Sequence, residues 1–167
     1  MTGVVLAYDA RSMINHRADS LLDGHQITVL HGGLVSEQVA GWLVEKLRAL
    51  QQAGAPQLKR FTVQCVNDQT MSQLHMRHMN DPSTTDVLTF NDGDQADVAV
   101  CVDEAARRAK EFNHELREEL LLYCLHAMLH AGGMDDQTPA DFAAMHGEEN
   151  RLLRAIGLAE IFGEVNP

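Results

Sequence analysis

The chain has 167 residues and a net charge of −11, and its 45% hydrophobic and 22% charged content is typical of a soluble globular protein. This length suits one domain with a substantial core, so we predict a single domain over residues 1–167. The acidic charge argues against broad electrostatic binding to nucleic acid, although it leaves room for a local basic patch.

No apolar run approaches the roughly 20 residues that a transmembrane helix needs. The first nine residues have neither a basic start nor a long apolar stretch, so no signal peptide is expected. Cys65, Cys101 and Cys124 form no C-x-x-C pair, and we predict buried, reduced thiols in a cytoplasmic protein. Aromatic residues make up 5% of the chain, so single-stranded nucleic acid would find few stacking platforms.

Apolar periodicity predicts the elements in chain order. Residues 1–25 are the least informative part. The expected strands are 4–8, 26–31, 61–66, 86–90 and 97–102, and the last two form a hairpin around residues 92–94. The expected helices are 36–51, 70–77, 103–112, 113–131 and 139–156. This order predicts an α+β fold, in which one small mixed sheet packs against several helices.

Capping residues mark the ends of these helices. Ser36, Asp103 and Asn113 are candidate N-caps, and Thr138 is followed by Pro139 at the first helical position. Glycines at 54, 132, 133 and 157 stand where helices are expected to end. The helix before Gly132 is apolar nearly all round in residues 120–125, which predicts a central helix buried on most sides.

The most informative motif is H-x-x-x-H-x-x-G-x-x-D, formed by His126, His130, Gly133 and Asp136. Histidines four residues apart project from one face of a helix. The glycine lets the chain turn back, so that Asp136 can reach the same point. Three nitrogen and oxygen ligands with a fourth position open are typical of a catalytic zinc site. We therefore predict that His126, His130 and Asp136 bind one zinc ion per chain.

Several neighbours are alternative or additional candidates. Asp135 could replace Asp136 as the ligand, and His146 could approach the metal, although an ordinary half-buried histidine is the simpler interpretation. Glu119 shares a helical face with His126 and could support the site, but a solvated glutamate is the simpler interpretation. Ala127 stands where the zincin motif H-E-x-x-H has its general base, which argues against a protease.

The run from His126 to Asp136 resembles the signature H-G-x-L-H-x-x-G-x-D-H of the YbeY-type endoribonucleases, a family of bacterial rRNA maturation factors. The chain departs from it in having Ala127 for glycine and Asp136 for the third histidine. Residues 85–90, T-D-V-L-T-F, resemble the family's T-D-V-L-S-F, and Ala96-Asp97 replaces a following Gly-Asp. The resemblance covers about residues 60–157 and, loosely, the helix at 36–51. The signature positions that match are His126, Leu129, His130, Gly133 and Asp135.

The resemblance implies a zinc-dependent, single-strand endoribonuclease in ribosomal RNA maturation and ribosome biogenesis, with metal-bound water attacking the phosphodiester. It also implies ribosomal RNA or ribosomal subunits as partners, with a ribosomal protein or a GTPase as a further partner and no membrane. The family commonly has an arginine before the T-D-V-L run that is implicated in RNA cleavage, and in an alignment without gaps its position falls on Met79. Arg77 takes its place if the loop at 80–84 shifts by two residues.

Two rival functions stay open at this point. One is a metal-dependent hydrolase of another substrate, including peptides. The other is a non-catalytic ribosome-assembly factor with a structural metal, which Met79 and the acidic charge favour.

Overall fold

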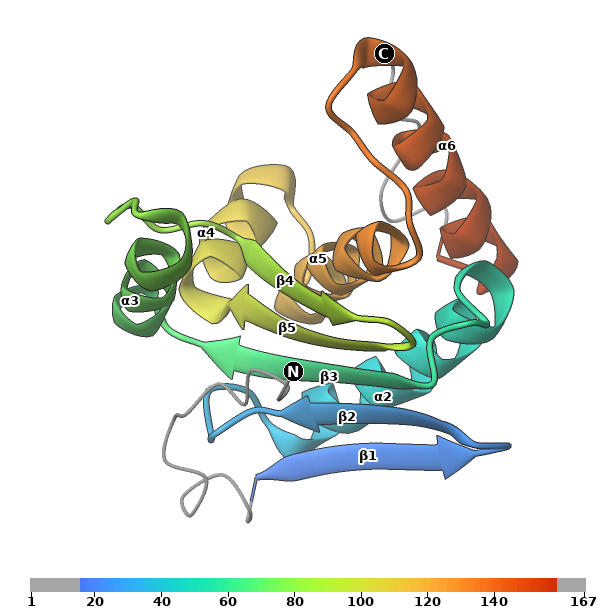
Figure 1. Ribbon diagram of the computed structural model, residues 1–167. Coiled ribbons are helices and arrows are strands. Elements are labelled where there is room, and N and C mark those ends of the chain that lie inside the picture. The colour runs from blue at the N-terminus through green and yellow to red at the C-terminus, as the bar shows by residue number, and fades with distance from the viewer. Residues whose placement is uncertain (1–15, 159–167) are drawn as a thin grey trace.

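The computed structural model describes residues 16–158, and the strand predicted at Val4–Tyr8 lies outside them (Figure 1). Within that range the chain forms one mixed sheet with the strand order β1-β2-β3-β5-β4 and five helices, which confirms the predicted α+β class. The strands are β1 (Arg17–Leu22), β2 (His25–Leu30), β3 (Arg60–Val66), β4 (Val87–Asp92) and β5 (Gln95–Cys101). The helices are α2 (Glu37–Gly54), α3 (Asp68–Met79), α4 (Val102–Phe112), α5 (Leu116–Ala131) and α6 (Pro139–Ala155).

The two sheet edges are antiparallel hairpins, β1 with β2 and β4 with β5, whereas β2, β3 and β5 run parallel. Parallel neighbours need a crossover connection, and α2 provides the one between β2 and β3. Helices α2 and α5 lie together on one face of the sheet, and α3 lies against one end of the other face (Figure 1). Successive side chains of β5 point to opposite faces of the sheet. Val98 and Val100 therefore join the main core, while Ala99 and Cys101 pack with Met71 of α3 on the other face.

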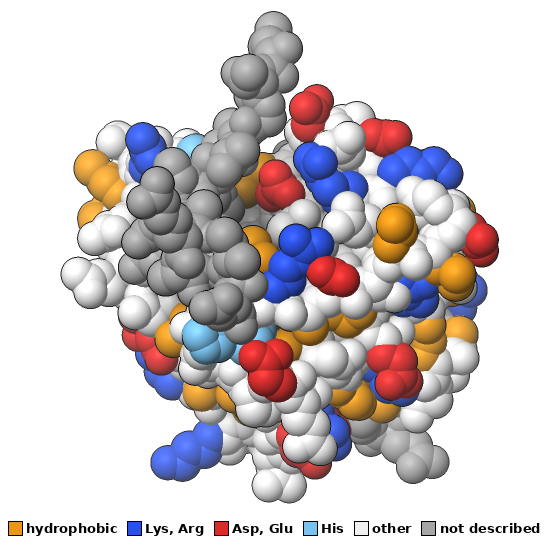
Figure 2. Space-filling view, turned by 90° about the horizontal axis from the view of Figure 1, so that it is seen from below, with side chains coloured by type: hydrophobic (Ala, Val, Ile, Leu, Met, Phe, Trp, Pro, Cys, Tyr) orange, Lys and Arg blue, Asp and Glu red, His pale blue; other side chains and the backbone are white. Residues whose placement is uncertain are grey.

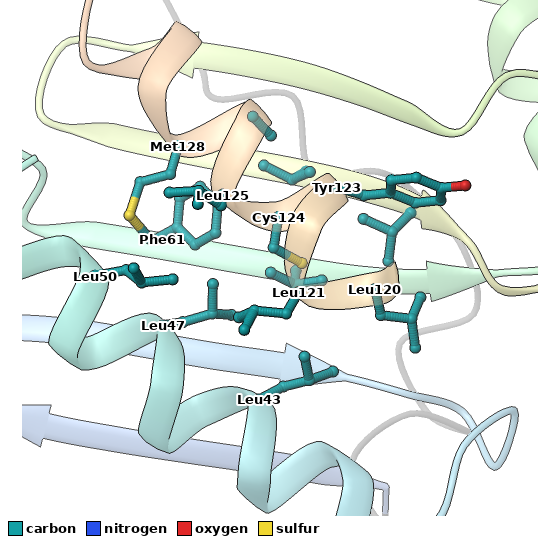
Figure 3. Packing of buried hydrophobic residues seen from close by; sticks show 14 of the residues in the cluster. Leu43, Leu47, Leu50, Phe61, Leu120, Leu121, Tyr123, Cys124, Leu125 and Met128 are labelled. Atoms are coloured by element: carbon teal, nitrogen blue, oxygen red, sulfur yellow. The ribbon is translucent and has the colours of Figure 1, made fainter. Parts of the chain in front are cut away.

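The main core forms where α2 and α5 pack beside each other against one face of the sheet (Figure 3). Leu121 and Leu125 of α5 are fully buried, as are Leu47 of α2 and Phe61 of β3. The prediction of a central helix buried on most sides is therefore confirmed. Cys65, Cys101 and Cys124 are also buried, and all three are free thiols. Among residues 16–158, no helix combines the length and apolarity that crossing a membrane requires.

Three helix ends follow local sequence signals. The Ser36 side chain accepts a hydrogen bond from Val39 N and begins α2, and Thr138 accepts one from Asp141 N and begins α6 with Pro139 at its first position. After α5 the chain turns at Gly133, whose φ of 99° favours glycine. These predictions rest on contacts within a few residues, and they are confirmed.

Other local predictions were wrong. Asp103 does not cap α4, which begins one residue earlier, after Cys101; the Asp103 carboxylate instead accepts a hydrogen bond of 2.8 Å from Asp68 N at the start of α3. Asn113 ends α4 in the left-handed conformation, and Glu115 begins α5 through a capping box. Strand β1 is not predicted by the sequence, because its residues R-A-D-S-L-L show no regular alternation of apolar and polar side chains.

Replacing Leu121 with alanine is expected to lower the free energy of unfolding by about 2–5 kcal/mol, because the side chain is fully buried in the main core and the rigid layers around it cannot collapse onto the cavity. Urea unfolding followed by circular dichroism measures the effect. Leu34→Ala is the control, since Leu34 is 42% exposed and should change stability much less. Equal losses in both variants would contradict the packing described above.

Candidate metal centre

The end of α5 carries two histidines on one helical face. His126 Nε2 and His130 Nε2 lie 3.0 Å apart, one turn from each other. The turn at Gly133 brings Asp136 back, and its Oδ2 lies 3.5 Å from His126 Nε2 and 3.6 Å from His130 Nε2. The structure therefore brings together the three residues predicted as ligands, and as a group they could hold a metal ion.

Contacts with the rest of the fold fix this end of α5. The Ala131 carbonyl accepts a hydrogen bond of 3.3 Å from Asn91 Nδ2 of β4. The Gly132 carbonyl accepts one of 3.2 Å from Gln57 Nε2, in the loop that leads to β3. Backbone carbonyls at a helix end have no partner within the helix, so these side chains both satisfy them and attach the end of α5 to β4 and to the loop before β3.

The other ring nitrogen of each histidine also has a partner. His126 Nδ1 donates to Glu149 Oε1 at 2.9 Å, and His130 Nδ1 donates to the Met134 carbonyl at 3.0 Å. Because a carboxylate and a carbonyl only accept hydrogen bonds, they keep the proton on Nδ1. Each neutral imidazole then presents the lone pair of its Nε2 to the space shared with Asp136. This is the arrangement by which outer partners orient metal-binding histidines.

Three acceptor atoms facing one another favour a cation between them. Two Nε2 lone pairs and a carboxylate oxygen otherwise lie close together without a donor. The hydrogen bond to Glu149 raises the pKa of His126 above its ordinary value, and the charges of Glu149, Asp136 and Asp86 act in the same direction against the effect of burial. The electrostatic environment thus attracts positive charge, whether a proton or a metal ion.

Of the two neighbouring aspartates, Asp136 is the one that faces the histidines. Asp135 is exposed, and its Oδ1 accepts a hydrogen bond of 2.8 Å from Asp136 N. Among the described residues, the group with converging ligand atoms contains Asp136 and not Asp135. Asp135 therefore shapes the turn that directs its neighbour.

Glu149 is a site residue that the sequence does not suggest. It is buried, with 4% of its surface exposed, and it lies on α6. Its Oε1 accepts from His126 Nδ1, and its Oε2 accepts from His146 Nδ1 at 2.8 Å. The one signal in the sequence is the spacing of three residues between His146 and Glu149 on a helix, which does not point toward His126.

The structure also corrects one expectation about a side chain near the site. Glu119 is not solvated: it is 4% exposed, and its Oε2 lies 3.3 Å from His114 Nδ1. His146 is half-buried, as expected, and contacts Glu149 rather than joining the three converging ligand atoms.

A cavity of about 850 Å³ opens beside the metal group, between α4, α5, α6 and the segment that precedes β4. His126 and Glu149 form part of its wall, so the cavity is continuous with the metal group. Arg108 of α4 also lines it. Arg77 is exposed in the last turn of α3 and is not among the described residues that line the cavity.

Comparison with known proteins identifies relatives of this chain. The family described as Endoribonuclease YbeY matches residues 31–157, which include the whole metal group. The chain is 34% identical to the protein named Endoribonuclease YbeY of Thermobifida fusca, over 58% of this chain and 71% of that protein. It is 29% identical to the protein of the same name from Symbiobacterium thermophilum, over 74% and 88% of the two chains. It is 32% identical to the protein of that name from Gloeobacter violaceus, over 75% of this chain and 70% of that protein.

A solved structure resembles the fold. The solution structure of TM1509 from Thermotoga maritima superimposes with a TM-score of 0.51, covering 84% of this chain and 99% of that one. Its sequence identity of 20% is low, so the likeness concerns the fold alone.

Proposed function

Since this chain belongs to the YbeY endoribonuclease family, we propose that it is a metal-dependent endoribonuclease that acts in ribosomal RNA processing. The observation that carries the proposal is the convergence of His126, His130 and Asp136 within the matched region. The relatives named above are endoribonucleases by name, and a bound metal ion is one means of activating water for hydrolysis of a phosphodiester.

We propose zinc as the metal. Ligands at zinc's usual distance of about 2.0–2.1 Å are separated by about 3.3–3.4 Å in a tetrahedron. The three separations among the ligand atoms here are 3.0, 3.5 and 3.6 Å. Two imidazoles and one carboxylate are also a donor set that zinc accepts, with one position open. Size and chemistry both support zinc at this site.

Each residue of the site has a distinct role in this function. His126, His130 and Asp136 would bind the ion, while Glu149 and the Met134 carbonyl hold the proton on Nδ1 of the two rings. Zinc, when bound, supplies a Lewis acid and a coordinated water whose pKa falls to near 7. Ala127 follows His126 where a zincin protease has its glutamate base, so the site lacks the residue on which peptide hydrolysis by that motif depends.

An acidic protein needs help to approach RNA. The net charge of −11 repels phosphate, most strongly at low ionic strength. Figure 2 shows Lys and Arg side chains interspersed with Asp and Glu over the described part of one face, rather than gathered together. We therefore propose that the chain meets its RNA in the cytoplasm on ribosomal subunits, with a ribosomal protein or a GTPase as a further partner. A contact between Arg77 and RNA stays a prediction.

Purified protein is expected to cleave ribosomal RNA, free or in assembled subunits, and a chelator should abolish the cleavage. His126→Ala should be inactive, because it removes one of the three ligands. His78→Ala is the control, since His78 is an exposed histidine outside the metal group. Gel analysis of the products and metal analysis of each variant provide the measurements.

The rival functions have their own outcomes in this experiment. Wild-type protein that carries zinc and binds ribosomal subunits without cleaving RNA would be an assembly factor with a structural metal. Zinc-dependent cleavage of a peptide substrate, without cleavage of RNA, would make the chain a hydrolase of another class.

A further inference from the structure

The cavity beside the metal group has a size and a composition of its own. Its volume of about 850 Å³ is large enough for a nucleoside-sized ligand. It shares His126 and Glu149 with the metal group, so a substrate bound at the metal would extend into it or past its entrance. The inference that follows rests on the proposed function, because it concerns which part of an RNA substrate occupies this space.

The carboxylates around the cavity disfavour a phosphate in its interior. Asp86, Glu104, Glu119 and Glu149 line it, and Arg108 is the one lysine or arginine among its described lining residues. Glu119 and Glu149 are each only 4% exposed, so their carboxylates lie within the wall rather than in solvent. Such a wall favours a neutral ligand that carries hydrogen-bond donors.

Two aromatic rings line the same cavity while remaining about half exposed. Phe112 is 51% exposed at the end of α4, and Phe142 is 49% exposed on α6. The Arg108 guanidinium lies 4.9 Å from the centre of the Phe112 ring, and the ring of His146 lies 4.1 Å from that of Phe142 in an edge-on arrangement. Exposed aromatic faces next to a cavity are stacking platforms for nucleic-acid bases, and an arginine can add to the stack.

We propose that this cavity binds one nucleobase of the RNA, that of a nucleotide adjoining the scissile phosphate. The base stacks on Phe142 or Phe112, and its exocyclic amino group donates to the carboxylates of the wall. The sugar-phosphate backbone of the RNA passes Arg108 at the entrance. Adenine, guanine and cytosine carry such an exocyclic amino group and uracil does not. The cavity thus selects amino-bearing bases and sets where the enzyme cuts.

Binding of short oligouridylates with one variable nucleotide tests the proposal. The variable nucleotide is adenosine, cytidine, uridine or an abasic ribose, and binding is measured by fluorescence anisotropy in the presence of a chelator, so that no cleavage occurs. Wild-type protein should bind the adenosine probe about tenfold more tightly than the abasic one, because one base stacks on an aromatic ring. The uridine probe should bind with intermediate affinity.

Matched variants locate the effect. Phe142→Ala should remove the preference for a base, whereas Met76→Ala should keep it, because Met76 is 48% exposed on α3 and does not line the cavity. Arg108→Ala should weaken all probes more than Lys110→Ala, although both remove one positive charge from α4. Phe142→Leu keeps the apolar volume without the aromatic face, so it guards against a general loss of packing.

The outcomes separate this proposal from the function on which it rests. Equal affinity for the adenosine and abasic probes, absence of binding by every probe, or a base preference that survives Phe142→Ala and Phe142→Leu would overturn the nucleobase cavity. A base preference that depends on Phe142, in a protein that cleaves no RNA when zinc is restored, would keep the cavity and reject the endoribonuclease.

Discussion

Replacing Asp136 with alanine is expected to lower zinc affinity by more than about 100-fold, since even the hydrogen-bond partners behind a ligand contribute 10- to 100-fold. Asp136 supplies one of three converging ligand atoms, and without it two neutral imidazoles are left to hold the ion. Titration with zinc against a competing chelator measures the change directly, without an activity assay. RNA cleavage should fall in parallel.

Asp135→Ala is the matched control, because it removes the same charge one residue away. Its carboxylate supports the turn through Asp136 N and does not face the histidines. We therefore expect a small loss of zinc affinity in this variant. Asp136→His should still bind zinc, since imidazole is a good zinc ligand. If Asp135→Ala lost zinc and Asp136→Ala retained it, the assignment of the third ligand would be wrong.

Replacing Glu149 with glutamine is expected to weaken zinc binding by about tenfold, and Glu149→Ala by up to about 100-fold. The glutamine keeps an oxygen that can accept from His126 Nδ1 but loses the charge that makes the imidazole a stronger ligand. Alanine removes the partner of both His126 and His146. Zinc titration against a chelator measures both variants, and circular dichroism checks that each is folded.

The neighbouring Glu148 provides the control for Glu149. Its carboxylate pairs with Arg151 on the surface of α6 and does not contact the metal group. Glu148→Gln should leave zinc affinity unchanged, because a charge removed from an exposed ion pair has little effect on a site it does not touch. Similar losses in Glu148→Gln and Glu149→Gln would mean that general charge, and not the hydrogen bond to His126, supports the metal.

The sequence by itself determined the features that depend on neighbours along the chain. Histidines four residues apart on a helix must share a face, so their spacing alone is enough to pair His126 with His130. Ser36 and Thr138 marked helix starts for the same reason, because an N-cap contacts a backbone amide two or three residues later. The family signature around His130 reflects the same local geometry.

Only the tertiary structure decided which distant groups meet. Glu149 lies 23 residues after His126 and contacts it because α6 packs beside α5, a placement that no periodicity encodes. The Asp103 carboxylate accepts from Asp68 N, 35 residues away, instead of capping its own helix. The parallel pairing of β3 with β5 ends both strands at the same edge and so brings the starts of α3 and α4 together. Local spacing fixes the direction of a side chain relative to its own helix, whereas its partner depends on how layers pack, and that is set by burial of the whole core.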